Sequence, residues 1–220
     1  MGTYQALQDR IADELGQRTD LSSQIKLAIQ TAIAKFERKQ FYFNQLRTPN
    51  VFDTVAGQEF YTSSDNANIG TMAKLNKVTV LVNGNRFTLN PRTADYLEDI
   101  SVNPAVTSYP FDYAYYAENL RLYPIPSGAY PITLMGTQRL SALSAGTDSN
   151  AWTTDAEALI RCEAKMDIYL NVLQQPDLAE TMAAQIYGTP GLPGARGYLY
   201  DLMAETANRQ ATPHIRPTYF

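Results

Sequence analysis

The sequence holds a single cysteine and a single histidine, so its candidate nucleophiles and metal ligands are few. A nucleophilic triad needs a base within hydrogen-bond reach of a Ser, Thr or Cys side chain. His214 lies in a proline-containing tail, and Cys162 falls on the apolar stripe of a predicted helix. Most zinc sites need about four nitrogen or sulfur ligands. We therefore expect Cys162 to be a core residue and predict no catalytic residue, no metal site and no cofactor.

Carboxylate pairs are the other side chains that could do chemistry, because glycosidases use two of them. The local clusters are Asp13 with Glu14, Glu98 with Asp99, and Asp155 with Glu157. Each lies near a predicted helix end or on an exposed face, where the helix dipole and solvation explain acidic residues. The chain is not expected to be an enzyme. A cell-wall glycosidase acting through Glu14 or Glu157 remains the alternative.

One basic cluster is present, and it comprises Lys35, Arg38, Lys39 and Arg47. Tyr42 and Phe43 are interleaved with it, as on surfaces that bind single-stranded nucleic acid. A solvated helix face, or a polar contact with an acidic protein surface, explains the same residues. The formal net charge of −4 argues against the phosphate backbone as the main partner. A nucleic-acid-binding module is therefore only a further alternative.

Helical periodicity occupies both ends of the chain. Helices are predicted over residues 4–15 and 21–40, the second one capped by Thr19 or Asp20. After residue 152, a helix should open on a capping box of Thr154 and Glu157. Pro176 should break this helix or begin the next one, which Gly188 should end, and a last helix should cover 198–209.

The middle of the chain has the composition and the turns of β structure. A strand is predicted at 41–44, and another over 130–138. Hairpins are predicted for 51–55 with 59–61, 78–82 with 86–89, and 113–116 with 119–123. The second of these contains Asn83-Gly84, a pair favoured where both turn residues need a positive φ. Residues 93–100 should form a short helix, and 62–71 reads as a long polar loop whose order is in doubt.

This pattern predicts an α+β fold that is mainly α, in which a bundle of N- and C-terminal helices carries a β-hairpin insertion. The bundle should comprise residues 1–47 and 152–209, and the β-rich insertion residues 48–140. Residues 141–151 read as a linker and residues 210–220 as an extended C-terminal arm.

The composition argues against a membrane protein and favours a protein with many protein partners. No apolar stretch approaches the roughly 20 residues that span a bilayer, so no membrane partner is expected. The 15 tyrosines and 8 phenylalanines favour extensive contacts with other proteins, because aromatic side chains are enriched at interfaces.

Several segments together resemble one protein family. They are residues 28–44 (AIQTAIAKFERKQFYFN), Thr54-x-x-Gly57-Gln58-x-x-Tyr61, Leu120-Arg121-Leu122-Tyr123-Pro124-x-Pro126, and Glu157-x-Leu159-Ile160-Arg161 after Trp152. In order and spacing they are similar to the head-to-tail adaptors of tailed bacteriophages, also called tail accessory factors or head completion proteins. The resemblance covers about residues 4–210.

The resemblance implies a structural virion protein of the neck or tail, assembled in the host cytoplasm. It implies a ring, typically of twelve copies, that docks on the portal protein. Such a ring extends the DNA channel, helps to retain the packaged DNA, and offers a platform to the next tail protein, which is a nozzle, tail tube or fibre. Lys35, Arg38, Lys39 and Arg47 are then candidates for contacts between subunits or with the DNA channel.

The C-terminal arm is the portal-binding element that the resemblance implies. Its candidate residues are Pro213, His214, Ile215, Arg216, Pro217, Tyr219 and Phe220. The two prolines restrict the backbone and reduce the entropy lost on docking. Ile215, Tyr219 and Phe220 are side chains of the kind that anchor interfaces, whereas a frayed terminus is the ordinary alternative.

Overall fold

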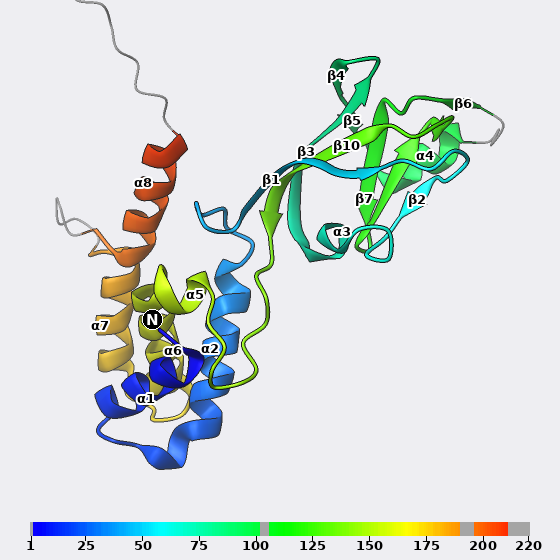
Figure 1. Cartoon of the computed structure of the whole chain (residues 1–220). Coiled ribbons are helices and arrows are strands. Elements are labelled where there is room, and N and C mark those ends of the chain that lie inside the picture. The colour runs from blue at the N-terminus through cyan, green and yellow to red at the C-terminus, as the bar shows by residue number, and fades with distance from the viewer. Residues whose placement is uncertain (1, 102–105, 190–195, 211–220) are drawn as a thin grey trace, which may run out of the picture. The chain divides into compact units, whose positions relative to one another are not determined.

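The structure is a computed structural model that describes residues 2–101, 106–189 and 196–210, without the side chains of 47–51 (Figure 1). It contains helices and sheets whose strands are mostly antiparallel, which confirms the predicted α+β class. The chain divides into two compact units. The helical unit comprises Met1–Phe43 and Leu140–Phe220, and the β unit comprises Asn44–Arg139.

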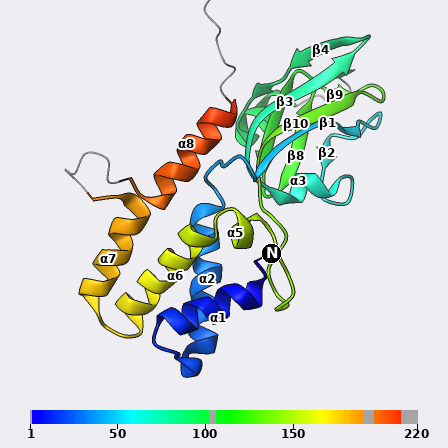
Figure 2. The ribbon, with the colours of Figure 1, turned by 60° about the vertical axis from the view of Figure 1, so that its left-hand side comes forward.

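The helical unit is built around one long central helix. Its helices are α1 (Tyr4–Glu14), η1 (Thr19–Leu21), α2 (Ser22–Phe36), α5 (Ala151–Thr154), α6 (Glu157–Asn171), α7 (Pro176–Tyr187) and α8 (Tyr198–Gln210). Helix α6 lies between α2 and α7 (Figures 1 and 2). The predicted helix periods, the start at Pro176 and the end at Gly188, whose φ is 85°, are confirmed.

Two details at the ends of α2 were predicted wrongly. Neither Thr19 nor Asp20 caps α2, because both lie in the 3-10 turn η1, and no side chain caps α2 at Leu21. The helix also ends at Phe36 rather than at Gln40.

The aromatic run after α2 is not the predicted strand. Phe41 is fully buried in the core of the helical unit. Its ring stacks on Phe43 with centroids 5.3 Å apart and meets the edge of Trp152 at 5.9 Å. Aromatic residues are common both in strands and in hydrophobic cores. Here the rings pack against Trp152 in the core, and the segment does not form a strand.

The segment before α6 is held by polar contacts within the helical unit. Asn150 and Thr153 form the capping box, on α5, so the predicted box of Thr154 and Glu157 was wrong. The carboxylate of Asp148 accepts hydrogen bonds from the backbone N–H of Ser144, at 2.8 Å, and Ala145, at 2.7 Å.

The β unit consists mainly of two four-stranded sheets. The first has the order β1-β10-β3-β4, formed by Gln45–Asp53, Pro131–Gln138, Met72–Val82 and Asn85–Thr88. The second has the order β2-β8-β7-β5, formed by Phe60–Tyr61, Asn119–Tyr123, Asp112–Tyr116 and Asn90–Pro91. The remaining elements are α3 (Ala67–Thr71), α4 (Ala94–Ile100), β6 (Thr107–Ser108) and β9 (Ile125–Pro126). Residues of both sheets, such as Val80 and Leu120, share one apolar core.

Two of the three predicted hairpins are present in this unit. Strands β3 and β4 pair across Asn83 and Gly84, whose φ values are 50° and 77°. Strands β7 and β8 pair as expected, and the helix at 93–100 and the strand at 130–138 are present.

Two expectations for the β unit were wrong. Residues 51–55 and 59–61 are not a hairpin, because β1 pairs with β10 and β2 pairs with β8 in the other sheet. The polar segment 62–71 is not a plain loop, since the Asn66 side chain caps helix α3 there.

Candidate interaction surfaces

The one cysteine is a core residue, as predicted. Cys162 is 1% exposed on α6, and its thiol donates a hydrogen bond of 3.3 Å to the Gln185 side chain. Burial raises the pKa of this thiol, which keeps it protonated and unreactive at neutral pH. His214 and the other proposed portal-binding residues, Pro213, Ile215, Arg216, Pro217, Tyr219 and Phe220, lie outside the described residues.

Glu14 and Glu157, distant in sequence, join one ion network between α1 and α6. Glu14 accepts hydrogen bonds from Arg161 and, at 2.6 Å, from Lys165. Arg10 lies 3.0 Å from Glu157 and 3.4 Å from Glu14. The network fastens the first helix to the central one.

The electrostatics of Glu14 are opposite to those of a catalytic acid. Burial opposes its ionisation, but the hydrogen bonds and charges of Lys165 and Arg161 outweigh burial and lower its pKa. A glycosidase acid needs a raised pKa so that it holds a proton at neutral pH. The arrangement thus suits a structural ion pair.

The predicted basic cluster is divided between different tasks. On α2, Lys35 pairs with Glu163 of α6, which is almost fully buried, and its ammonium lies 5.6 Å from the ring centre of Tyr187. Burial works against the charge of Lys35, yet the hydrogen bonds to Glu163 and Tyr187 raise its pKa. Arg38 and Lys39 are exposed in the turn after α2. Arg47 belongs to β1, and its side chain is outside the described part.

The aromatic residues next to this cluster are occupied within the helical unit. The Tyr42 hydroxyl donates to Asp155 at 2.8 Å, and the Arg209 guanidinium covers its ring at 3.7 Å. Burial and the Asp155 carboxylate raise the pKa of Tyr42 to about 12. Phe43 packs against Phe41 and Trp152. Both rings are thus engaged by side chains of the same unit, which speaks against a platform on which nucleotide bases stack.

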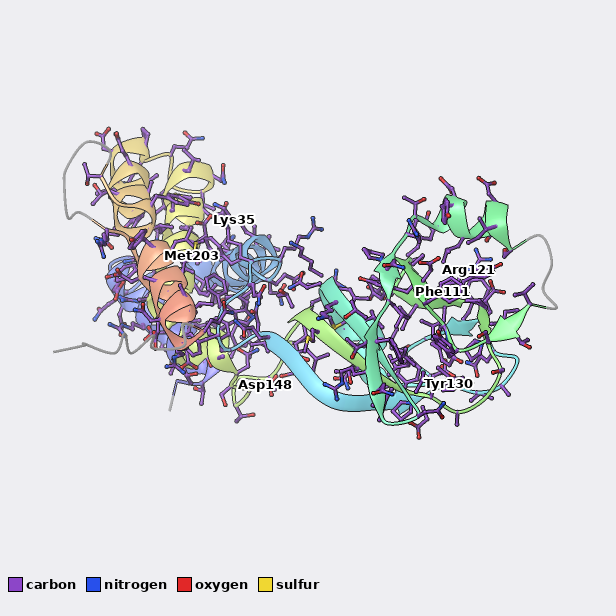
Figure 3. All side chains as sticks on the ribbon, turned by 90° about the horizontal axis from the view of Figure 1, so that it is seen from above. Lys35, Phe111, Arg121, Tyr130, Asp148 and Met203 are labelled. Atoms are coloured by element: carbon purple, nitrogen blue, oxygen red, sulfur yellow. The ribbon has the colours of Figure 1, made fainter. Side chains whose placement is uncertain are left out.

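A second ion cluster, missed in the sequence, organises the β unit. Buried Arg121 on β8 donates to Glu59 at 2.5 Å and to Ser101 at 2.8 Å, and pairs with Glu98 of α4 at 2.7 Å. Its guanidinium also lies 5.1 Å from the centre of the Phe60 ring. Figure 3 labels Arg121 in this unit and Lys35 in the helical unit. The cluster holds α4 against the sheet.

Two exposed aromatic residues line a pocket that Arg121 also borders. Phe60 is 48% exposed and Tyr116 is 73% exposed, and both line a shallow pocket with Ala114 and Asn119. Where exposed apolar groups are contiguous on a folded protein, they mark interaction surfaces or ligand grooves. The only sequence signal for them was the high content of tyrosine and phenylalanine.

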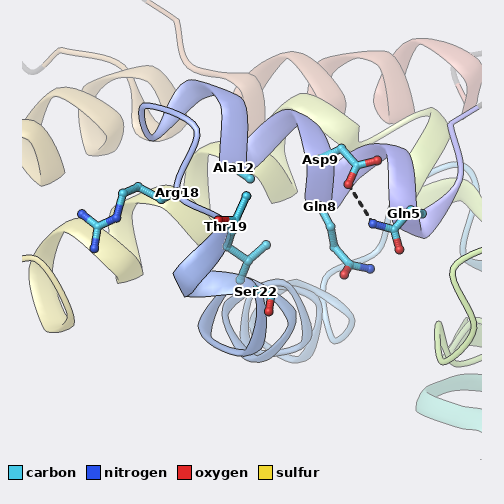
Figure 4. Close-up of a pocket in the computed structure, with 8 residues that line it drawn as sticks. Gln5, Gln8, Asp9, Ala12, Arg18, Thr19 and Ser22 are labelled. Carbon is cyan, nitrogen blue, oxygen red and sulfur yellow. Dashed lines mark hydrogen bonds between the residues drawn. The ribbon is translucent and has the colours of Figure 1, made fainter.

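A pocket whose lining residues are mainly of polar types lies between α1 and the start of α2 (Figure 4). Its side chains bond with one another: Gln5 donates to Asp9 at 2.7 Å, and Gln8 donates to the Tyr4 carbonyl at 3.1 Å. Arg18 at its rim is paired with Asp20 at 2.8 Å. This pocket holds no nucleophile beside a base.

Among the residues that the structure describes, no three His, Cys, Asp or Glu side chains gather as a metal site would require. Within the same residues, no helix has the length and apolar character needed to cross a membrane.

Among the described residues, the helical unit also exposes large apolar side chains on four helices. They are Leu27 on α2, Leu170 on α6, Leu178 and Tyr187 on α7, and Tyr198, Tyr200 and Met203 on α8. The described sites thus consist of ion clusters that fix helices and of apolar side chains that face outward. The outward-facing apolar side chains are the part that suits contacts with other proteins.

Two comparisons with known proteins bear on the class of this protein. A search of curated proteins finds no match to this chain. The family model described as SU10 adaptor protein matches residues 2–214, which is nearly the whole chain. The chain therefore belongs to the SU10 adaptor family and is a phage structural adaptor, a component of the virion.

Proposed function

We propose that this protein forms a ring that joins the portal to the tail, extends the DNA channel and helps to retain the packaged genome. Membership of the adaptor family over residues 2–214 is the observation that carries the proposal. The apolar side chains exposed on α2, α7 and α8 support it, because a ring subunit needs surfaces for its neighbours.

The proposed partners are the portal protein, other copies of this chain, typically twelve in the ring, and the next tail protein. The C-terminal arm, residues 210–220, is the proposed portal-binding element, with Ile215, Tyr219 and Phe220 as its anchors. Assembly would take place in the host cytoplasm.

Arg38, Lys39 and Arg47 remain proposed contacts to a neighbouring subunit or to the DNA channel. Lys35 is a weaker candidate for DNA, because its ammonium is engaged by Glu163. A channel wall with few unpaired cations would let DNA slide, since each phosphate contact by Lys or Arg adds affinity.

The test compares the full chain with a chain truncated after Gln210. Each is mixed with purified portal rings of the same phage, and complexes are separated on a density gradient. We expect the full chain to co-sediment with the portal and the truncated chain to remain free while giving the same circular dichroism spectrum. A chain with residues 211–220 in scrambled order serves as the matched control. Equal co-sedimentation of all three would contradict the role of the arm.

A further inference from the structure

The helical unit has two edges that face away from each other. Because α6 lies between α2 and α7, the outer faces of these two helices border the unit on opposite sides of α6 (Figures 1 and 2). The colours show that α2 and α7 run in the same direction and that α6 runs against both.

The outer face of α2 carries uncharged side chains along its middle and a lysine, Lys26, at one side. Its exposed residues are Ser23, Lys26, Leu27, Gln30, Thr31 and Ala34, which we call the α2 edge. Leu27 is 64% exposed, more than any other leucine among the described residues. No acidic residue occurs in Ser22–Phe36, so the charge of this face is positive.

The outer face of α7 has the opposite charge. Its exposed residues are Asp177, Leu178, Glu180 and Thr181, which we call the α7 edge. Leu178 is 44% exposed. No Lys or Arg occurs in Pro176–Tyr187, so this face is negative.

The charged residues and the leucines of the two edges lie at the same height, measured along the axes of α2 and α7. Lys35 reaches the ring of Tyr187 at 5.6 Å, which puts these two residues side by side. Lys26 precedes Lys35 by nine residues, or about 13.5 Å of helix, and Leu178 precedes Tyr187 by about the same distance. Lys26 and Leu27 are thus level with the stretch from Asp177 to Glu180.

We propose that the α2 edge of one copy docks on the α7 edge of the next copy. Lys26 then faces Asp177 and Glu180 of the neighbour, and Leu27 packs against Leu178. These contacts form if neighbouring copies are related by rotation about an axis roughly parallel to these helices. Such a rotation leaves the height of each residue along the axis unchanged, so residues at equal heights meet. The small side chains of Thr31 and Ala34 allow the helices to approach closely. Two different edges make a heterologous contact, the kind that closes into a ring.

This inference rests on the proposed ring and names the surface that builds it. The first test mixes chains carrying Leu27→Cys with chains carrying Leu178→Cys on portal rings and adds a short bis-maleimide. Native Cys162 is 1% exposed and serves as an internal unreactive thiol, checked with unsubstituted chain. We expect covalent dimers from the mixture and none from either variant alone.

The outcomes separate the interface from the function. Assembly on the portal without cross-linked dimers in the mixture would overturn the proposed edges while leaving the ring standing. Dimers from Leu27→Cys chains alone would also overturn them, because they indicate a symmetric contact. Failure of unsubstituted chain to assemble on the portal would overturn both the interface and the proposed function.

A charge test measures the electrostatic part of the same contact. Lys26→Glu should raise the protein concentration needed for half-maximal ring formation about tenfold, because it places like charges together. Adding Asp177→Lys and Glu180→Lys to the same chain should restore most of the loss. Lys77→Glu, an exposed change in the β unit, is the matched control. An effect of Lys26→Glu no larger than the control's, or no recovery in the triple variant, would count against the edges.

Discussion

Replacing Phe41 tests the assignment of the aromatic run to the core of the helical unit. Phe41 is 0% exposed and contacts both Phe43 and Trp152. Removing a buried phenylalanine side chain costs about 3–5 kcal/mol, of which lost transfer energy and the remaining cavity are the main parts. Phe41→Ala should therefore destabilise the helical unit by about 4 kcal/mol. Phe41→Leu keeps most of the volume and should cost about 1 kcal/mol.

Fluorescence of Trp152 during urea unfolding is the assay. Trp152 is the only tryptophan, and it lies in the helical unit, so its signal reports that unit. With a denaturant slope of about 2 kcal/mol/M, Phe41→Ala should lower the urea midpoint by about 2 M. Phe41→Leu should lower the midpoint by about 0.5 M, which is measurable even where the alanine variant is largely unfolded.

Met203→Ala is the matched control in the same unit, because Met203 is 50% exposed on α8. We expect its midpoint to change by less than about 0.3 M. If the Phe41 variants shifted the midpoint as little as Met203→Ala, residues 41–43 would not belong to this core and the reasoning would be refuted.

Three further predictions concern the ion clusters and the buried thiol. The pKa of Glu14 is lower in the folded chain than in the unfolded chain, where it is about 4.3. Ionised Glu14 therefore contributes its full stabilisation above about pH 4.3, and this contribution is lost as the pH falls through the folded pKa. Melting temperatures measured between pH 7 and pH 3 should thus fall less steeply for Glu14→Gln than for the native chain. A slope unchanged by Glu14→Gln would show that the network is not linked to folding. Arg121→Met should destabilise the β unit by about 1–3 kcal/mol, because it removes the donor to Glu59 and Ser101. Hydrogen exchange of the α4 amides should become faster in this variant, but not in Arg86→Met, which changes an exposed arginine. Equal exchange in both variants would argue against the cluster. Cys162 should react with a thiol reagent only at the rate of unfolding, and fast labelling of the native chain would contradict its burial.

Local patterns in the sequence were enough for most helices and for two hairpins. The period of apolar residues located α1, α6, α7 and α8, because one face of each helix meets the core. Asn83-Gly84 fixed the β3–β4 turn, since few other residue pairs accept two positive φ values.

Pairings over long sequence distances were not predictable in the same way. Strand β1 pairs with β10, about 80 residues later, and no local signal distinguishes that partner from the nearby residues 59–61. The capping box shows a related limit, because Thr154 with Glu157 fits the usual motif, whereas the box that forms has Thr153 where Glu or Gln is usual.

The candidate sites were the least predictable part. The ion network joins Glu14 to Arg161 across 147 residues, and the sequence gives no sign of that contact. Lys35 appeared in sequence as one of four similar cations, whereas the structure commits it to buried Glu163. Side chains that a fold brings together from distant elements need the fold itself to be identified.

The proposed adaptor ring is tested most directly by native mass spectrometry of the chain with the portal ring of its own phage. The account predicts a complex that contains one copy of this chain for each portal subunit. A portal ring that stays bare, with the chain remaining monomeric at saturating concentration, would contradict the account.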